Sequence, residues 1–258
     1  MGSMNKSHSI LYFDSEGREN LPHVLRCVKR AFKRREDLRT CKVVVYTAIG
    51  EGPAMAYNML QEWDPKIIAI TVGPDFYIVR GEKKLSPFIP PKVKTFFDGV
   101  EIPVVKARLP FDRIEGATAH NEQMKLIHDV ISLFGGSFVP CIQSVLQACD
   151  HGLVEIGEKV VALTGDCAAV ITASTTGKFL TRDEGMSINE IICKPRNLTI
   201  ARGAPDKAAE QTETLFERQS PKLKAPVASK ARPSKTKPTE LLGSGKELVQ
   251  SAKEETKK

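Results

Sequence analysis

The sequence predicts an α/β fold built around a mostly parallel β-sheet, and three observations support this. Apolar runs rich in β-branched residues, at Lys42–Tyr46 and Val160–Leu163, each end in a short loop that contains threonine and glycine. Segments with helical spacing of apolar residues separate the early runs. The 258 residues are 41% hydrophobic, which is enough for one sizeable core. Strands that alternate with helices favour parallel βαβ units with right-handed crossovers.

The first half of the chain alternates in this way. Leu21–Lys33 has apolar residues at helical spacing and a basic outer face, and Pro53 suits the first turn of a helix. A segment with four prolines, Pro74–Pro91, predicts a loop or excursion. The predicted strands are Ser9–Phe13, Lys42–Tyr46, Lys66–Val72 and Ile102–Ala107, and the predicted helices are Leu21–Lys33, Pro53–Trp63 and Val93–Phe97.

The second half predicts two helices followed by three strands. The first helix should end at Gly135-Gly136, because glycine suits a left-handed C-cap. The predicted helices are Ala119–Phe134 and Val139–Cys149, and the predicted strands are Val160–Leu163, Ala168–Ala173 and Ser187–Cys193. Lys194–Arg196 is expected to close the domain.

Composition divides the chain into three parts. Residues 1–8 are interpreted as a disordered N-terminus or cloning remnant, 9–200 as the α/β domain and 201–258 as a disordered basic tail. The tail holds 13 Lys and Arg against 8 Asp and Glu, so most of the net charge of +7 belongs to it. Such a segment cannot bury enough apolar surface to fold alone. It could bind nucleic acid or an acidic partner weakly, or serve only as a solubilising tether.

The cysteines and histidines predict no metal site. The six cysteines show no Cys-x-x-Cys pair, so we expect free, buried thiols. His120 and His128 are two helical turns apart, too far to share an ion. We find no run of apolar residues long enough for a membrane span and no secretory signal, so a cytoplasmic protein is expected, with no membrane partner.

Several motifs, taken in order, resemble the C-terminal domain of pyruvate kinase and a family of stand-alone proteins built like it. The core motifs are Val43–Gly50 with Asp64–Thr71, and Val160–Gly165. The stand-alone family adds Gly17–Asn20, Phe134–Leu163 and Glu190–Arg196, so that the resemblance extends from about Ile10 to Asn197.

The resemblance implies a three-layer α/β/α sandwich, with a mostly parallel sheet and an antiparallel strand near the C-terminus. It also implies a regulatory, ligand-binding role, because the catalytic chemistry of pyruvate kinase lies in a separate barrel domain. We therefore expect no pyruvate kinase activity. The implied ligand is a phosphate-bearing metabolite or a nucleotide such as FMN.

The predicted ligand site lies in the loops at the carboxyl ends of the strands, where backbone N–H groups are exposed. Thr47–Gly52 matches the effector-phosphate loop of pyruvate kinase, but Glu51 replaces its arginine and so opposes a bare dianion. Arg18 is the best candidate for an anion contact; it could equally be a surface residue that caps the next helix. The candidate ligand-binding residues are Arg18, Asn20, Thr47, Gly50, Gly52, Thr71, Gly73, Thr164 and Gly165.

Simple turns without a ligand remain an alternative for both threonine-glycine loops. The catalytic residues are unknown, and Cys167 is at most a weak candidate nucleophile. Three functions stay open: a small-molecule-binding regulatory or sensor protein, an enzyme that uses the same strand-end pocket, and an interaction module recruited through its basic tail. A homo-oligomer is also possible.

Overall fold

The computed structural model describes residues 9–73, 78–80, 83–85, 88–111 and 120–198. The chain divides into two units, Met1–Ala225 and Pro226–Lys258, and every helix and strand given below belongs to the first. The predicted N-terminal segment 1–8 and the whole predicted tail, 201–258, lie outside the described residues. No helix among the described residues is long and apolar enough to cross a membrane.

The described part of the chain contains one seven-stranded sheet, in the order β1-β9-β8-β7-β2-β3-β6. β8 is antiparallel to both of its neighbours, and every other neighbouring pair is parallel. The prediction of a mostly parallel sheet with an antiparallel strand near the C-terminus is therefore confirmed. The strands are β1 (Leu11–Phe13), β2 (Lys42–Tyr46), β3 (Ile67–Val72), β6 (Val104–Ala107), β7 (Lys159–Leu163), β8 (Ala168–Thr172) and β9 (Ser187–Pro195).

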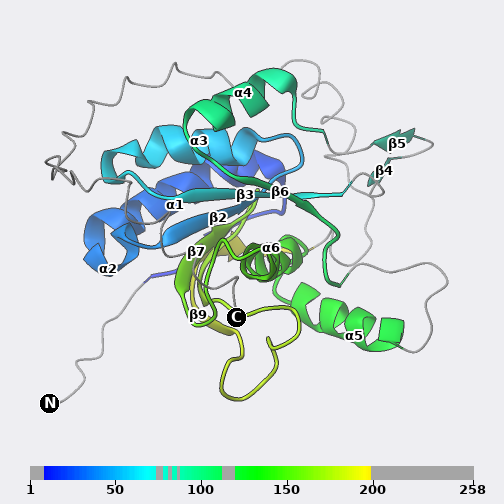
Figure 1. Ribbon diagram of the computed structural model, residues 1–258. Helices are drawn as coiled ribbons and strands as arrows, with labels where there is room; N and C mark the ends of the chain where they lie inside the picture. The colour runs from blue at the N-terminus through cyan, green and yellow to red at the C-terminus, as the bar shows by residue number, and fades with distance from the viewer. Residues whose placement is uncertain (1–8, 74–77, 81–82, 86–87, 112–119, 199–258) are drawn as a thin grey trace, which may run out of the picture. The chain divides into compact units, whose positions relative to one another are not determined.

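Helices cover both faces of this sheet, which gives the predicted three layers (Figure 1). One face carries α1 (Leu21–Arg34), α3 (Glu51–Leu60) and α4 (Pro91–Gly99). The other face carries α6 (Phe138–Asp150), against which α5 (His120–Ser132) packs. Short elements complete the described chain: the 3-10 turns Arg18–Asn20 and Gln61–Trp63, α2 (Glu36–Arg39), and the hairpin of β4 (Ile78–Arg80) with β5 (Lys83–Leu85).

The alternation of side chains along β2 shows why this sequence forms a central strand. Val43 and Val45 are buried in the core beneath α1 and α3, and Val44 is buried in the core beneath α6. Successive residues of a strand point to opposite faces, so a strand covered on both sides must be apolar throughout. β3 follows the same rule, with all six residues buried.

Three local predictions need correction. α2 is absent from the sequence-based prediction because a single helical turn has no visible periodicity. Pro74–Pro91, predicted as a loop or excursion, contains the hairpin of β4 and β5, whose two strands the sequence did not single out. β9 continues through Lys194 and Pro195, because Pro195 pairs with Phe13 of β1 and the Arg196 amide then donates to the Phe13 carbonyl at 2.8 Å.

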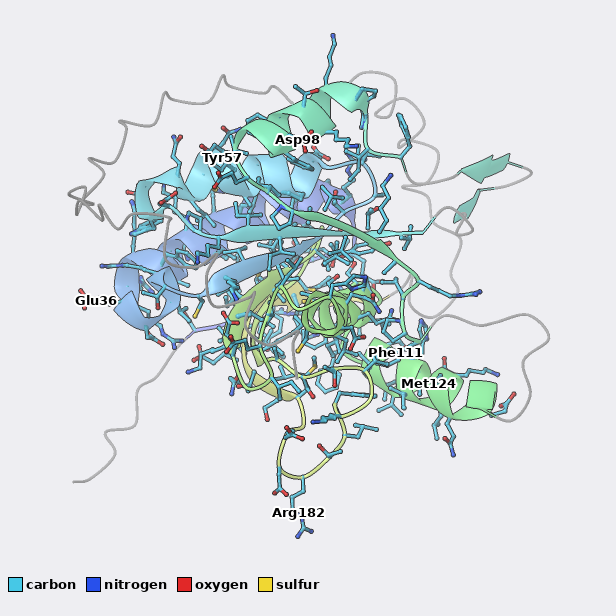
Figure 2. All side chains as sticks on the ribbon, viewed as in Figure 1. Glu36, Tyr57, Asp98, Phe111, Met124 and Arg182 are labelled. Carbon is cyan, nitrogen blue, oxygen red and sulfur yellow. The ribbon has the colours of Figure 1, made fainter. Side chains whose placement is uncertain are left out.

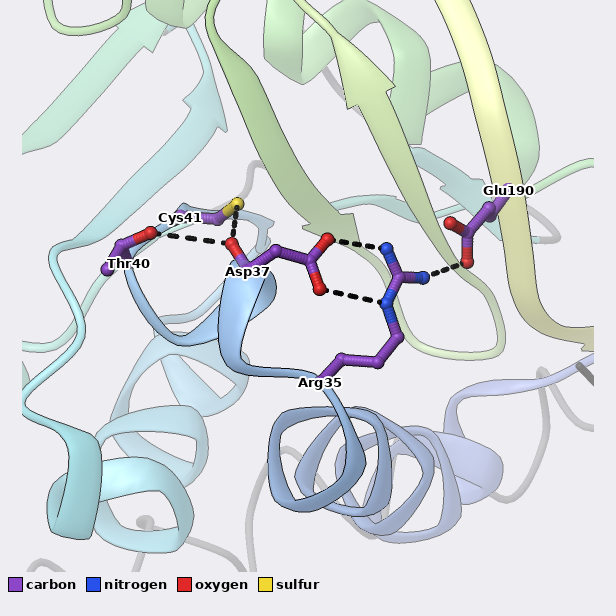
Figure 3. A network of polar contacts seen from close by, with 5 residues as sticks. All are labelled: Arg35, Asp37, Thr40, Cys41 and Glu190. Carbon is purple, nitrogen blue, oxygen red and sulfur yellow. Dashed lines mark hydrogen bonds and ion pairs between the residues drawn. The ribbon is translucent and has the colours of Figure 1, made fainter. Parts of the chain in front are cut away.

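A network of polar contacts joins the end of α1 to β9 (Figure 3). The Arg35 guanidinium, 17% exposed, donates two hydrogen bonds to the Asp37 carboxylate, at 3.2 and 2.7 Å, and forms an ion pair with Glu190. The hydrogen bond from Arg35 holds the pKa of Asp37 below its usual value. The network therefore fixes the C-terminal end of α1 against the sheet at the amino end of α2.

Candidate functional site

The predicted site residues lie along the carboxyl edge of the sheet. β1, β2, β3 and β7 run in the same direction, so the loops that follow them meet at one edge. Helices α3 and α6 begin at this same edge, on opposite faces. In open α/β sheets, ligands bind where connections leave the carboxyl edge toward different faces. At β2 the chain leaves this edge into α3, whereas β7 leads through a tight turn directly into β8 of the same sheet.

Arg18 and Glu51 form an ion pair across this edge. The Arg18 Nε donates to Glu51 Oε2 at 2.8 Å, and the guanidinium Nη2 also contacts that oxygen. Arg18 comes from the first loop and Glu51 from the first turn of α3. Glu51 is therefore not an isolated negative charge, because a guanidinium from a distant segment neutralises its carboxylate.

Thr47 organises the loop between β2 and α3. Its side chain is buried, and its Oγ1 accepts a hydrogen bond from the Gly50 amide at 2.9 Å. Gly50 has a left-handed backbone with φ of +85°, which favours glycine. The loop is thus a rigid turn that delivers the N-terminus of α3 to the sheet edge.

The glycines of the site lie against atoms of the chain itself. A Cβ on Gly50 would come within 2.6 Å of Val93 Cγ1, and one on Gly165 within 3.2 Å of the Arg18 Cα. A Cβ on Gly52 would lie 3.0 Å from Val45 Cγ1. Close packing and a positive φ therefore favour glycine at position 50, and a side chain at Gly52 or Gly165 would need its neighbours to shift by a few tenths of an ångström. Gly73 has no such neighbour, and its amide continues the β3–β6 pairing by donating to the Ala107 carbonyl at 3.1 Å.

Three polar side chains stand in a row on one face at this edge. The register pairs Tyr46 with Ile70 and Thr71 with Lys106, so that Thr47, Thr71 and Lys106 follow one another across β2, β3 and β6. Paired residues of parallel strands point to the same face, here the face of α3 and α4. Thr71 is buried and its Oγ1 has no hydrogen-bond partner, whereas Lys106 is exposed.

Thr164 and Gly165 lie in the tight turn between the antiparallel strands β7 and β8. The Thr164 amide donates to the Cys167 carbonyl at 2.9 Å, and Thr164 Oγ1 lies 3.1 Å from Cys167 Sγ. Both side chains are buried. This geometry is that of a simple turn, the alternative that the sequence left open for this loop. Burial also raises the pKa of the Cys167 thiol well above its usual value, which suppresses the reactive thiolate. All six cysteines are free and buried, as predicted.

Asp166, in the same turn, was not among the predicted residues. Its side chain is 2% exposed, and its Oδ2 accepts a hydrogen bond from the Gly17 amide at 2.9 Å. Burial raises the pKa of Asp166 to about 6, although Gly17 and the nearby Ser137 hydroxyl favour the ionised form. Its Oδ1 has no hydrogen-bond partner.

Glu16 extends this acidic group toward α6. It is buried, and its Oε1 accepts a hydrogen bond from the Gly136 amide at 3.0 Å, just before α6 begins. Its negative charge contributes to the raised pKa of Asp166. In the part of the chain that the structure describes, no three His, Cys, Asp or Glu side chains are placed to hold a metal ion.

The first loop closes on itself through Asn20. The Asn20 amide group donates from Nδ2 to the Ser15 carbonyl at 2.8 Å, and the side chain lies on the exposed side of the loop. Asn20 is therefore part of the loop's own structure. The first loop reaches the rest of the edge through its neighbours Glu16, Gly17 and Arg18.

The structure thus brings Arg18, Thr47, Gly50, Gly52, Thr71, Gly73, Thr164 and Gly165 to one edge, and adds residues that the sequence did not single out. A signal existed for two of these. Lys106 is a lone cation near the end of an apolar strand, and Asp166 directly follows the threonine-glycine turn. Glu16 and Ser137 gave no signal, because their importance depends on contacts between distant segments.

No protein-family model matches this chain, and no curated protein matches it in sequence. The fold and the edge geometry define its class: an α/β/α sandwich whose polar buried side chains gather at the carboxyl ends of the strands. The resemblance to the C-terminal domain of pyruvate kinase stays a prediction.

Proposed function

We propose that this chain is a small-molecule-binding protein whose site lies over the carboxyl ends of β7, β2 and β3. One observation supports this most directly. Among the described residues, the two buried side-chain atoms without a hydrogen bond are Thr71 Oγ1 and Asp166 Oδ1, and both lie at this edge. Burying an unpaired polar group costs about 1–3 kcal/mol, so folded proteins retain few such groups outside functional sites.

Thr71 faces α3 and α4, whereas Asp166 lies beside Ser137 at the start of α6, so a ligand that engages both must extend across the edge of the sheet. Thr71 lies near the end of β3, and Asp166 comes just after the end of β7. Strand β2 lies between these two strands in the sheet. Two strand spacings correspond to roughly 10 Å. A single extended ligand could therefore engage both ends, once the loops above the edge admit it.

The charges on the face of α3 support a phosphate-bearing ligand. Thr47 and Thr71 offer hydroxyl groups, Lys106 offers a cation, and α3 directs its N-terminus to the same place. Helix N-termini attract anions through their free amides and dipole. The ion pair with Arg18 removes the objection that Glu51 would repel a phosphate.

Native mass spectrometry of the purified protein, followed by fluorescence titration with FMN, tests this proposal. Thr71→Val should weaken FMN binding roughly 2- to 12-fold, which corresponds to the net value of one hydrogen bond, about 0.5–1.5 kcal/mol. Thr172→Val is the matched control, because Thr172 ends β8 at the opposite edge of the sheet. Equal affinity in both variants would reject the site, and no binding of FMN or of any co-purified molecule would reject the function.

A second candidate function, an enzyme that uses the same edge, is favoured by Asp166 alone. A carboxyl group with a pKa of about 6 can exchange a proton near neutral pH, and such shifted groups concentrate at active sites. Incubation with a set of phosphate-bearing metabolites would distinguish the two functions. Turnover that Asp166→Asn abolishes, with binding retained, would indicate catalysis.

A further inference from the structure

Helix α5 forms a second surface, separate from the residues of the candidate ligand site. α5 has apolar side chains on two faces. Met124, Ile127 and Ile131 face inward and pack on the core beneath α6. Met124 and Phe111, both labelled in Figure 2, belong to this same apolar core. The face of α5 that points away from the core is unusual, because it also carries apolar side chains.

Large apolar side chains of that outward face are exposed to solvent. Leu126 is 64% exposed and Leu133 is 69% exposed, and Leu180 of the β8–β9 connection is 73% exposed. We call this surface the α5 patch; it consists of Leu126, Val130, Leu133, Phe134, Leu180 and Ile188. Four of these residues, Leu126, Val130, Leu180 and Ile188, also line an apolar groove of about 400 Å³ between α5 and the β8–β9 connection. The largest apolar patch on a typical monomer covers about 300–600 Å² and is often functional.

We propose that the α5 patch is the interface between two copies of this chain, related by a two-fold axis. The area supports this occupant. With roughly half of each side chain exposed and about 30 Å² for each apolar carbon, as implied by about 0.8 kcal/mol per CH₂ at about 25 cal/mol per Å², the six residues offer on the order of 500 Å² of apolar surface. A stable dimer buries about 800 Å² per subunit, of which about two thirds is apolar in the centre. The patch therefore has the size of the apolar centre of a standard interface.

The spacing along α5 supports a two-fold arrangement. Leu126 and Val130 are four residues apart and so share one face of α5, and Leu133 and Phe134 follow directly after the last helical residue, Ser132. Val130 lies midway between Leu126 and Phe134. Antiparallel pairing centred on Val130 would place Leu126 opposite the partner subunit's Phe134, and the same contact would repeat on the other side. Each copy supplies both projecting side chains and a groove, as an isologous interface requires.

The full-length chain tests the proposal by its mass in solution. Sedimentation velocity with light scattering should give twice the chain mass of 28.4 kDa. Val130→Glu should produce a monomer with an unchanged circular dichroism spectrum, because a charge at the centre of the interface would be buried without a partner. Phe88→Glu is the control: Phe88 is 61% exposed but lies outside the patch, so this variant should stay dimeric.

A cross-link tests the geometry independently of stability. All six natural cysteines are buried, so Val130→Cys adds a thiol at an exposed position. Mild oxidation should join two copies covalently at this position, and Phe88→Cys should not form the same dimer efficiently. A monomeric wild-type chain would overturn the proposal and would leave another segment of the chain or a different protein as the occupant. A dimer that persists in Val130→Glu and does not cross-link through Val130→Cys would place the interface elsewhere.

Discussion

Asp166 shows how one buried carboxyl group can link stability to pH. Burial raises its pKa from 3.8 to about 6 in the folded protein. The folded state therefore prefers the protonated acid, and its contribution to stability is fully present below about pH 4 and is lost as the pH rises through 6. At neutral pH the ionised group remains buried, at a cost to the free energy of unfolding.

Asp166→Asn should remove this dependence. The neutral amide keeps an acceptor for the Gly17 amide and cannot ionise. Between pH 4 and pH 7, the free energy of unfolding of the variant should rise relative to wild type by up to about 3 kcal/mol, since each pKa unit corresponds to about 1.4 kcal/mol. Urea denaturation at the two pH values measures the change. Asp98→Asn, on the exposed side of α4, is the control and should show no such trend; a parallel trend in both variants would contradict the assignment.

Thr71→Val should have opposite effects on stability and on binding. The hydroxyl is buried without a partner, so replacing it with a methyl group of similar shape should raise the free energy of unfolding by about 1 kcal/mol. The same change should weaken binding of the proposed ligand. Thermal denaturation of the ligand-free protein checks the first effect. A loss of stability would mean that Thr71 Oγ1 already has a partner, such as a bound water.

At the scale of elements, the Arg35 network is the contact that fixes α1 to β9. Arg35→Ala should lower the free energy of unfolding by about 1–2 kcal/mol, because it removes a partly buried guanidinium and leaves Glu190 and Asp37 unpaired. Part of this difference should disappear at high salt, where exposed ion pairs are screened. Chemical denaturation with urea at low and high salt provides the measurement.

The stability of the Lys178→Ala variant provides a comparison for the effect of Arg35→Ala. The ion pair between Lys178 and Glu184 is about half exposed on both sides, so its removal should change stability by no more than about 0.5 kcal/mol. If the two alanine variants were equally stable, the Arg35 network would be a surface feature without structural consequence.

Elements also show what the sequence could predict. Strands β2 and β3 can be predicted from the sequence, because a strand buried on both faces appears as an unbroken run of apolar residues. For Lys42–Tyr46 the predicted and observed bounds are the same. The positions of candidate site residues such as Thr47 and Thr71 could be predicted, because each lies at the carboxyl end of a predicted strand. The contacts of Glu51 with Arg18 and of Glu16 with Gly136 could not be predicted, because they join segments that are distant in the sequence.

At the scale of the whole molecule, the boundary of the folded domain remains a prediction from composition. Limited proteolysis should trim the chain to a core that ends near residue 200, since the sequence beyond Gly203 is rich in Lys, Pro, Ser and Glu. Mass spectrometry of the fragments gives the end point. Stable fragments that retain residues well beyond 203 would show that the tail contributes to the folded domain.

The pairing of β1 with β9 has a consequence for synthesis of the protein. Leu11–Phe13 is made before every other strand of the sheet, but its partner residues Cys193–Pro195 belong to the last strand of the sheet to be made. Strands β2, β3 and β6 can pair as they emerge, while β1 must wait for the end of the domain. Contacts between such distant segments close large loops and form slowly. An interrupted chain would therefore leave β1 unpaired and would expose Phe13, which is buried in the folded domain, to other nascent chains.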